Sequence, residues 1–172
     1  IILFKMIINL HKVNLKKKYP LQISRGIHSN SQNIFVELIK DGITSWGESA
    51  PGLNEGAASS FEVEDALKKL INSDLDNLSI YEIHQRSKDL NIPPCAYAAL
   101  DTALWDWHAQ KAQMPLYQFL GLPCPKTPTS LTIGINPPEV IKERVETVIS
   151  NPEVKALKIK LGSPDGIEYD KL

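Results

Sequence analysis

The chain has 172 residues, enough for one ordinary domain or for one small domain followed by part of a second. Hydrophobic residues make up 42% and charged residues 23%, the composition of a globular protein rather than of a disordered one. The 19 basic and 20 acidic residues nearly cancel, so charge gives no reason to expect a nucleic acid or an anionic membrane as a partner.

The start of the chain and the cysteines bear on where the protein works. Residues 1–10 are mostly apolar but too few to span a bilayer, and no cleavage site of small residues follows them, so they predict a strand. Cys95 and Cys124 lack the spacing of a metal site, and nothing else suggests a disulfide framework, so we expect a reducing cytoplasm. Position 1 is not Met, and we expect this sequence to be part of a longer chain.

The first sixty residues predict an antiparallel sheet. One strand is expected near residues 5–15, and residues 35–40 and 43–46 form two further runs of strand-forming residues. Between these two runs stands Asp41-Gly42, which favours a tight hairpin because both positions tolerate a positive φ.

Two segments of the same region predict loops. Residues 18–33 contain Pro20, Gly26 and several small polar residues, which are typical of a long connection. Residues 48–58 contain a proline, an asparagine and two glycines, and they predict a second loop.

Four helices are predicted after the sheet. Ser59 and Ser79 each stand three residues before a glutamate, the pattern of a capping box at a helix start. Residues 95–111 carry apolar residues at helical spacing and predict the longest helix. A short helix at 116–120 is expected to end at Gly121, because glycine favours the conformation of a helix C-terminus.

The character of the chain changes at residues 122–129, which contain three prolines and no periodicity. This segment predicts a linker, so we divide the chain into a first domain at 1–121 and a second segment at 130–172.

The second segment reads as strand, helix and strand, with the strands at 130–135 and 156–161. This order implies parallel strands joined by a right-handed crossover. Asn136 is expected to cap the intervening helix. The apolar residues of that helix are expected to form a buried face: Val140, Ile141, Val145, Val148 and Ile149.

Lys158 and Lys160 lie on the last predicted strand, where side chains two residues apart face the same way. Two ammonium groups side by side repel each other, which favours the neutral amine that a general base requires. A strand with one solvated face decorated by lysines would show the same pattern. Because parallel strands are usually covered on both faces, a lysine pair there points to a function.

Several segments resemble the N-terminal half of proteins of the enolase superfamily, and four of them occur in the family's order and spacing. Four of them resemble the branch that contains muconate lactonizing enzyme and mandelate racemase: SWGESAPGLNEG (45–56), CAYAALDTALWDWHAQKAQMPLYQFLG (95–121), TSLTIGI (129–135) and KALKIKLG (155–162). The fifth, YPLQISRG (19–26), together with TIGI most resembles the dipeptide epimerases, typified by L-Ala-D/L-Glu epimerase.

The resemblance implies an α+β capping domain followed by the beginning of a (β/α)7β barrel. The barrel is expected to be truncated in this sequence, because a complete one needs about 200 residues or more. By the same resemblance, Lys160 is the base that removes the α-proton from one face of the substrate. Lys158 is expected to tune that base and to touch the substrate carboxylate.

Two further residues are candidates for substrate binding. By the same resemblance, Arg25 is expected to reach over the barrel mouth and grip a substrate carboxylate, which suits a bidentate guanidinium. Thr132 is expected to line the pocket. The alternatives are an exposed loop arginine and a strand hydroxyl that is satisfied by its neighbours.

The resemblance also implies a metal. An α-proton next to a carboxylate is weakly acidic, and in the family Mg²⁺ binds the carboxylate and spreads the charge of the enediolate intermediate. The acidic ligands and a second lysine on the opposite face are expected beyond residue 172. Asp165, Glu168 and Asp170 follow the lysine strand and are interpreted as helix N-terminal charges, so no metal ligand is assigned within the chain.

The expected function is that of a Mg²⁺-dependent epimerase acting on a small dipeptide or another carboxylate substrate. A muconate cycloisomerase or an o-succinylbenzoate synthase carries the same Lys-x-Lys pattern. A non-catalytic remnant of a capping domain is the alternative of another class, and a coding sequence that continues in frame past residue 172 would argue against it. A homo-oligomer is a further possibility for the assembly of the protein, since family members commonly assemble through such domains.

Overall fold

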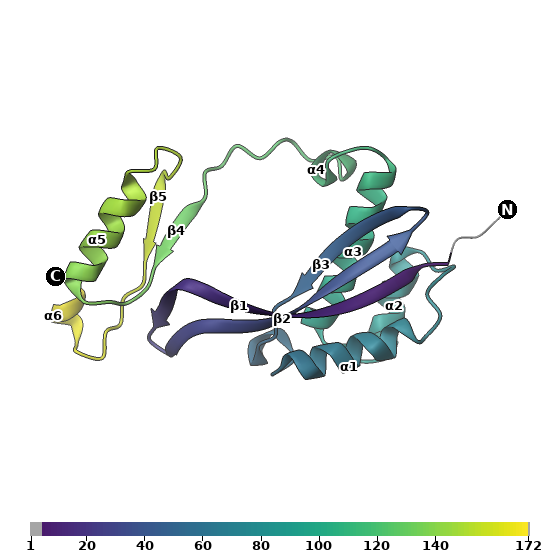
Figure 1. Cartoon of the computed structure of the whole chain (residues 1–172), viewed down its shortest axis with the longest axis horizontal. Helices are drawn as coiled ribbons and strands as arrows, with labels where there is room; N and C mark the ends of the chain where they lie inside the picture. The colour runs from purple at the N-terminus through teal and green to yellow at the C-terminus, as the bar shows by residue number, and fades with distance from the viewer. Residues whose placement is uncertain (1–4, 172) are drawn as a thin grey trace. The chain divides into compact units, whose positions relative to one another are not determined.

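The computed structural model describes residues 5–171, which group into two compact units. The first unit contains the chain up to Leu15 together with Gln32–Cys124, and the second contains Lys16–Ser31 together with Pro125–Leu172. The units therefore do not follow the chain in order, because a segment from the N-terminal part belongs to the second unit. Figure 1 shows the elements that make up both.

A three-stranded sheet runs through the N-terminal part of the chain. Its strands are β1 (Ile7–Ile23), β2 (Gly26–Lys40) and β3 (Ile43–Ser49), in the order β1-β2-β3. The predicted hairpin is confirmed: β2 and β3 pair antiparallel, and Asp41 and Gly42 at the turn have φ angles of 52° and 76°. The positive angles at both positions match the turn that the Asp-Gly pair favours.

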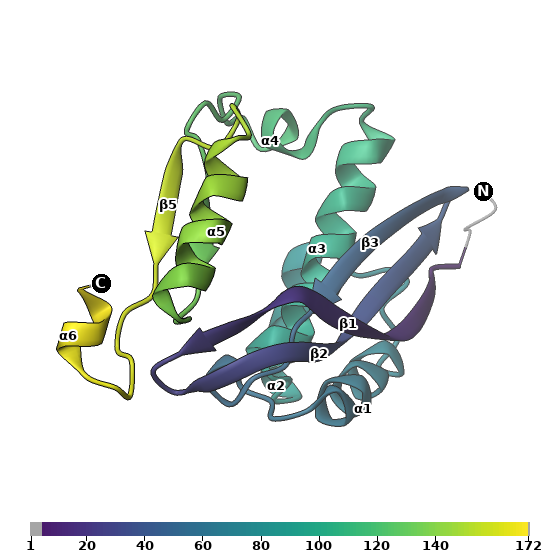
Figure 2. The same ribbon diagram turned by 60° about the vertical axis from the view of Figure 1, so that its left-hand side comes forward.

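The prediction of a long loop at residues 18–33 is wrong. β1 and β2 instead continue as a long hairpin that turns at Ser24 and Arg25 (Figures 1 and 2). Pro20 was taken as a loop signal, but β1 is an edge strand of the sheet, and edge strands tolerate proline because they leave backbone groups unpaired. We call residues 16–31, the part of this hairpin that belongs to the second unit, the hairpin tip.

The helices of the first unit begin largely where the sequence predicts. They are α1 (Ser60–Ile71), α2 (Ile80–Asp89), α3 (Pro94–Lys111) and α4 (Leu116–Phe119), and a short 3-10 turn, η1 (Leu53–Glu55), precedes them. The Ser79 side chain accepts a hydrogen bond from the N–H of Glu82, whose carboxylate accepts from the N–H of Ser79, so this capping box is confirmed. No helix within residues 5–171 combines the length and the apolar run needed to cross a membrane.

The core of the first unit forms where α3 packs on the sheet. A Cβ added to Gly47 on β3 would lie 1.9 Å from the carbonyl oxygen of Ala99 on α3, so the two backbones approach as closely as they do because Gly47 has no side chain. Ala96, Ala99 and Ala103 are fully buried along this seam. Larger buried side chains fill the space beside it: Ile34, Val36, Leu38, Val63, Leu67, Leu70 and Leu100.

The C-terminal part of the second unit forms the predicted βαβ arrangement. β4 (Ser130–Ile133) and β5 (Ala156–Ile159) pair in parallel, α5 (Pro138–Ile149) connects them, and the short α6 (Ile167–Asp170) follows. Both strands are shorter than predicted. The parallel pairing confirms the parallel strands that the element order implied.

Two details of α5 differ from the prediction. Pro137, which offers no side-chain cap, stands at the N-cap, and the Asn136 side chain instead donates to the carbonyl of Gly134 at 3.0 Å. Proline fixes φ near the helical value and needs no N–H partner, so the Pro137-Pro138 pair starts this helix without Asn136. The expected apolar face is only half-buried, and Ile149 is 61% exposed, because within the described residues α5 covers two strands alone.

Candidate active site

The lysine strand lies beside the first strand of the βαβ arrangement. In the parallel register Thr132 is the partner of Lys158 and Ile133 is the partner of Ile159. The N–H of Lys160 donates to the carbonyl oxygen of Ile133 at 2.9 Å, so the ladder continues one residue past β5. Because strand side chains alternate, Lys158 and Lys160 share one face of this pair of strands, and Thr132 faces the same way beside them.

The two lysines differ in exposure. Lys158 is exposed, whereas Lys160 is half-buried and borders a groove of about 350 Å³. The other residues that line the groove come from both ends of the βαβ arrangement: Ile135, Asn136, Pro138, Ile141, Ile159, Leu161 and Asp170. Of the two predicted catalytic lysines, Lys160 is therefore the less exposed.

The acidic residues after the lysine strand are engaged in local structure. The Asp170 carboxylate accepts hydrogen bonds from the N–H groups of Gly162 and Ser163, at 2.8 and 3.0 Å. The Ser163 hydroxyl bonds to the Asp165 carboxylate and also accepts from the N–H of Asp165. These bonds close the loop between β5 and α6.

The hairpin tip meets the end of β4 within the second unit. The N–H of Ile135 donates to the carbonyl oxygen of Gln22 at 2.9 Å. Arg25 lies at the turn of the hairpin, is exposed, and makes no hydrogen bond or ion pair with residues 5–171. The structure thus brings the tip that carries Arg25 into the same unit as Thr132, Lys158 and Lys160.

Sequence reasoning missed the residues through which the tip is held. It singled out Arg25 for its charge, whereas the contacts to the ends of β4 and β5 come from Gln22 and Ser24. The contact of Gln22 is made by its backbone, so no pattern of side chains in the sequence could have predicted it.

The family now follows from direct comparison. The N-terminal domain of the mandelate racemase / muconate lactonizing enzyme family matches residues 6–121. The chain belongs to this family. The resemblance to the enolase superfamily and the α+β capping domain are thereby confirmed.

Relatives within the family have names that agree with one another. The chain is 58% identical, over 94% of its length, to a hydrophobic dipeptide epimerase of Flavobacteria bacterium (strain MS024-2A). It is 45% identical, over 96% of its length, to a hydrophobic dipeptide epimerase of Roseobacter litoralis. It covers 46% of the first relative and 48% of the second, so the chain spans about half the length of the curated relatives it matches.

Solved structures of family members superpose on the chain. A dipeptide epimerase from Enterococcus faecalis V583, complexed with Mg and the dipeptide L-Leu-L-Tyr, matches with a TM-score of 0.84 and 28% identity. The match covers 97% of this chain and 47% of that one. Among residues 5–171 of our chain, no group of three or more His, Cys, Asp or Glu side chains is placed to hold a metal ion.

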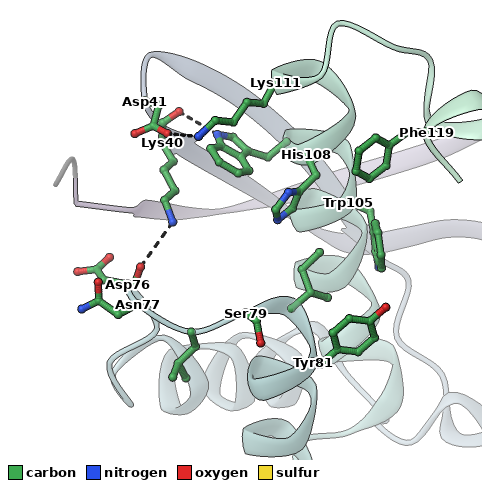
Figure 3. A pocket seen from close by; sticks show the side chains of 13 residues that line it. Lys40, Asp41, Asp76, Asn77, Ser79, Tyr81, Trp105, His108, Lys111 and Phe119 are labelled. Atoms are coloured by element: carbon green, nitrogen blue, oxygen red, sulfur yellow. Dashed lines mark hydrogen bonds and ion pairs between the residues drawn. The ribbon is translucent and has the colours of Figure 1, made fainter. Parts of the chain in front are cut away.

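A larger cavity lies in the first unit, and none of the residues predicted for the site lines it. It measures about 830 Å³ and is walled by aromatic side chains of α2, α3 and α4, among them Tyr81, Trp105, His108 and Phe119 (Figure 3). At its rim, Lys111 pairs with Asp41 at 2.8 Å. Burial, with the nearby charges of Lys40 and Lys111, lowers the pKa of His108. Trp105 and Trp107 of α3 both line the cavity, and Trp107 is only 5% exposed because it also packs in the core.

Proposed function

We propose that this chain is the N-terminal half of a dipeptide epimerase, and that the whole enzyme removes and returns the α-proton next to the substrate carboxylate. The observation that carries the proposal is the lysine strand. Lys158 and Lys160 stand on a parallel strand beside Thr132 in a chain that is 58% identical to a protein named hydrophobic dipeptide epimerase.

In this proposal Lys160 is the base for one face of the α-carbon. Lys160 is half-buried and borders a groove lined mainly by apolar residues. Lys158, on the same face and exposed, contacts the substrate carboxylate beside the base. A general acid or base of this kind typically contributes about 10²–10⁴-fold to the rate.

Arg25 and Thr132 are proposed to bind the substrate. Arg25 is exposed and has all of its guanidinium N–H groups available, so it can grip a carboxylate or carbonyl oxygen. The Thr132 hydroxyl stands in register with Lys158 and can hydrogen-bond the same end of the substrate.

A dipeptide with apolar side chains is the proposed substrate. The relatives at 58% and 45% identity are named hydrophobic dipeptide epimerases, whereas the Bacillus subtilis L-Ala-D/L-Glu epimerase is 31% identical. The same names favour epimerisation over the cycloisomerase and o-succinylbenzoate synthase alternatives. We propose Mg²⁺ as the cofactor of the whole enzyme, held by residues other than those of this chain, and a cytoplasmic location.

The test is α-proton exchange followed by NMR in D₂O with the full-length protein, Mg²⁺ and a panel of substrates. Both epimers of Leu-Tyr should exchange and interconvert, and faster than those of Ala-Glu. Exchange of Ala-Glu alone would overturn the substrate class, and the absence of exchange with every dipeptide would overturn the epimerase.

A further inference from the structure

Gly134 directly follows β4 and has no side chain at the point where the hairpin tip approaches it. A Cβ added to Gly134 would lie 2.9 Å from both the backbone N and the backbone O of Gln22, closer than real Cβ atoms come to such atoms. The φ angle of Gly134 is not in the left-handed region, so its conformation does not require glycine. The close approach of the Gln22 backbone is what requires glycine at this position.

The close approach at Gly134 accompanies a main-chain hydrogen bond. The N–H of the next residue, Ile135, donates to the carbonyl oxygen of Gln22 at 2.9 Å, and Ile135 is 5% exposed. A bulkier residue at position 134 would push the Gln22 backbone away and leave this buried N–H without its partner, which is costly.

Two further contacts hold the same tip. The Arg144 guanidinium of α5 lies over the Tyr19 ring, 4.4 Å from its centroid. A Cβ added to Gly162, which follows the lysine strand, would lie 3.2 Å from the Cβ of Ser24. The tip is therefore held from β4, from α5 and from the end of the lysine strand, and all three contacts lie within the second unit.

We propose that Gly134 is a positioning residue: its lack of a side chain seats the hairpin tip on β4 and so holds Arg25 and Ser24 near the end of the strand that carries Lys160. The catalytic consequence rests on the function proposed above. Because the tip carries the substrate-gripping Arg25 but not the base, loosening it affects substrate binding more than proton transfer. The seat itself is a structural property and does not depend on the reaction.

The experiment compares Gly134→Ala with Ser130→Ala in the full-length protein. Ser130 is exposed at the other end of the same strand, so its change controls for a small substitution in β4. Hydrogen exchange followed by mass spectrometry should show residues 16–31 exchanging about fivefold faster in Gly134→Ala, the change expected when one hydrogen bond is lost. Arg144→Ala, which removes only the cation–π contact, should speed the same segment by about two- to fivefold.

The kinetic readout separates positioning from a general structural effect. In Gly134→Ala, KM for the dipeptide should rise at least about fivefold while kcat changes less than about twofold. The reason is that the variant loses contacts that bind the ground state and the transition state equally. Unchanged hydrogen exchange in residues 16–31 of Gly134→Ala would contradict the proposal that Gly134 positions the hairpin tip. Exchange that is equally faster throughout α5 and β4 would contradict it as well. A fall in kcat at constant KM would overturn its role in binding.

The two proposals fail separately. If the full-length protein exchanges no dipeptide α-proton, the proposed function fails, and exchange in residues 16–31 of Gly134→Ala and Arg144→Ala still decides whether the seat exists.

Discussion

On β2 in the first unit, Ile34 and Val36 are fully buried and Leu38 is 1% exposed, whereas on the lysine strand of the second unit Ile159 and Leu161 are 48% and 62% exposed. The side chains compared are all aliphatic, so residue type does not explain the difference. α3 packs so closely over the first sheet that only glycine fits at Gly47, while β5 has a single neighbouring strand within residues 5–171.

The comparison shows that the core of the first unit and the residues proposed for catalysis lie in different units. The first unit contains a hydrophobic core of its own. The second unit carries the candidate catalytic residues on strands that are only partly covered, and the chain spans about half the length of its relatives. Substitutions in the first unit should therefore change unfolding, and substitutions on the lysine strand should change turnover.

The largest effect is expected from Lys160→Ala in the full-length enzyme. Each direction of epimerisation would use Lys160 as base or as acid, so interconversion should fall about 10²–10⁴-fold or more in both directions. NMR of both epimers in D₂O measures this. Lys155→Ala, which removes an exposed lysine just before β5, is the matched control and should behave as wild type. Interconversion by Lys160→Ala at near the wild-type rate would show that the base has been misassigned.

A core truncation in the first unit should have the next largest effect. Leu100 on α3 is fully buried, so Leu100→Ala should lower the free energy of unfolding by about 2–5 kcal/mol. Leu161→Ala, at an exposed position of the second unit, should change it by only about 0.5 kcal/mol. Denaturant unfolding of the 172-residue chain compares the two. Equal losses of unfolding free energy in the two variants would contradict the difference in burial between the two units.

Removing a helix cap in the first unit should cost less. Ser79→Ala should lower the unfolding free energy by about 1 kcal/mol, because the N–H of Glu82 loses its acceptor. The hydrogen bonds from Ser79 also lower the pKa of Glu82, so its stabilising contribution is present at neutral pH and is lost as pH falls through that lowered value.

Glu82→Gln is the control for the cap, since glutamine can still accept from Ser79 but does not titrate. Unfolding curves at a series of acidic pH values should show a smaller loss of stability on acidification in Glu82→Gln than in wild type. An identical acid profile in both proteins would contradict the assignment.

The smallest effect concerns His108 in the wall of the large cavity. Its pKa lies below the ordinary value of 6.5, so between these two values the unfolded chain binds a proton that the native state does not. Stability should therefore decline as pH falls below 6.5 and level off below the native pKa. NMR titration of the ring measures the native value, and His108→Gln should lessen the decline in unfolding free energy. A ring that titrates at or above 6.5 would refute this.

The sequence by itself determined the features that depend on neighbouring residues. The cap at Ser79, the Asp41-Gly42 turn and the long α3 follow from local bonds and side-chain periodicity. The parallel pairing of the strand that carries Lys158 and Lys160 follows from the order of strand, helix and strand. The family also followed from motifs within continuous segments.

Only the tertiary structure decided how residues 16–31 fold and what they contact. Pro20 and Gly26 favour a loop locally, yet the segment forms the end of a hairpin and groups with the second unit. The physical reason is that it is held by a backbone hydrogen bond from Ile135 to Gln22 beside Gly134. Every residue has a backbone N–H or carbonyl to offer, so a contact between distant backbones leaves no signature in the side chains that a sequence displays.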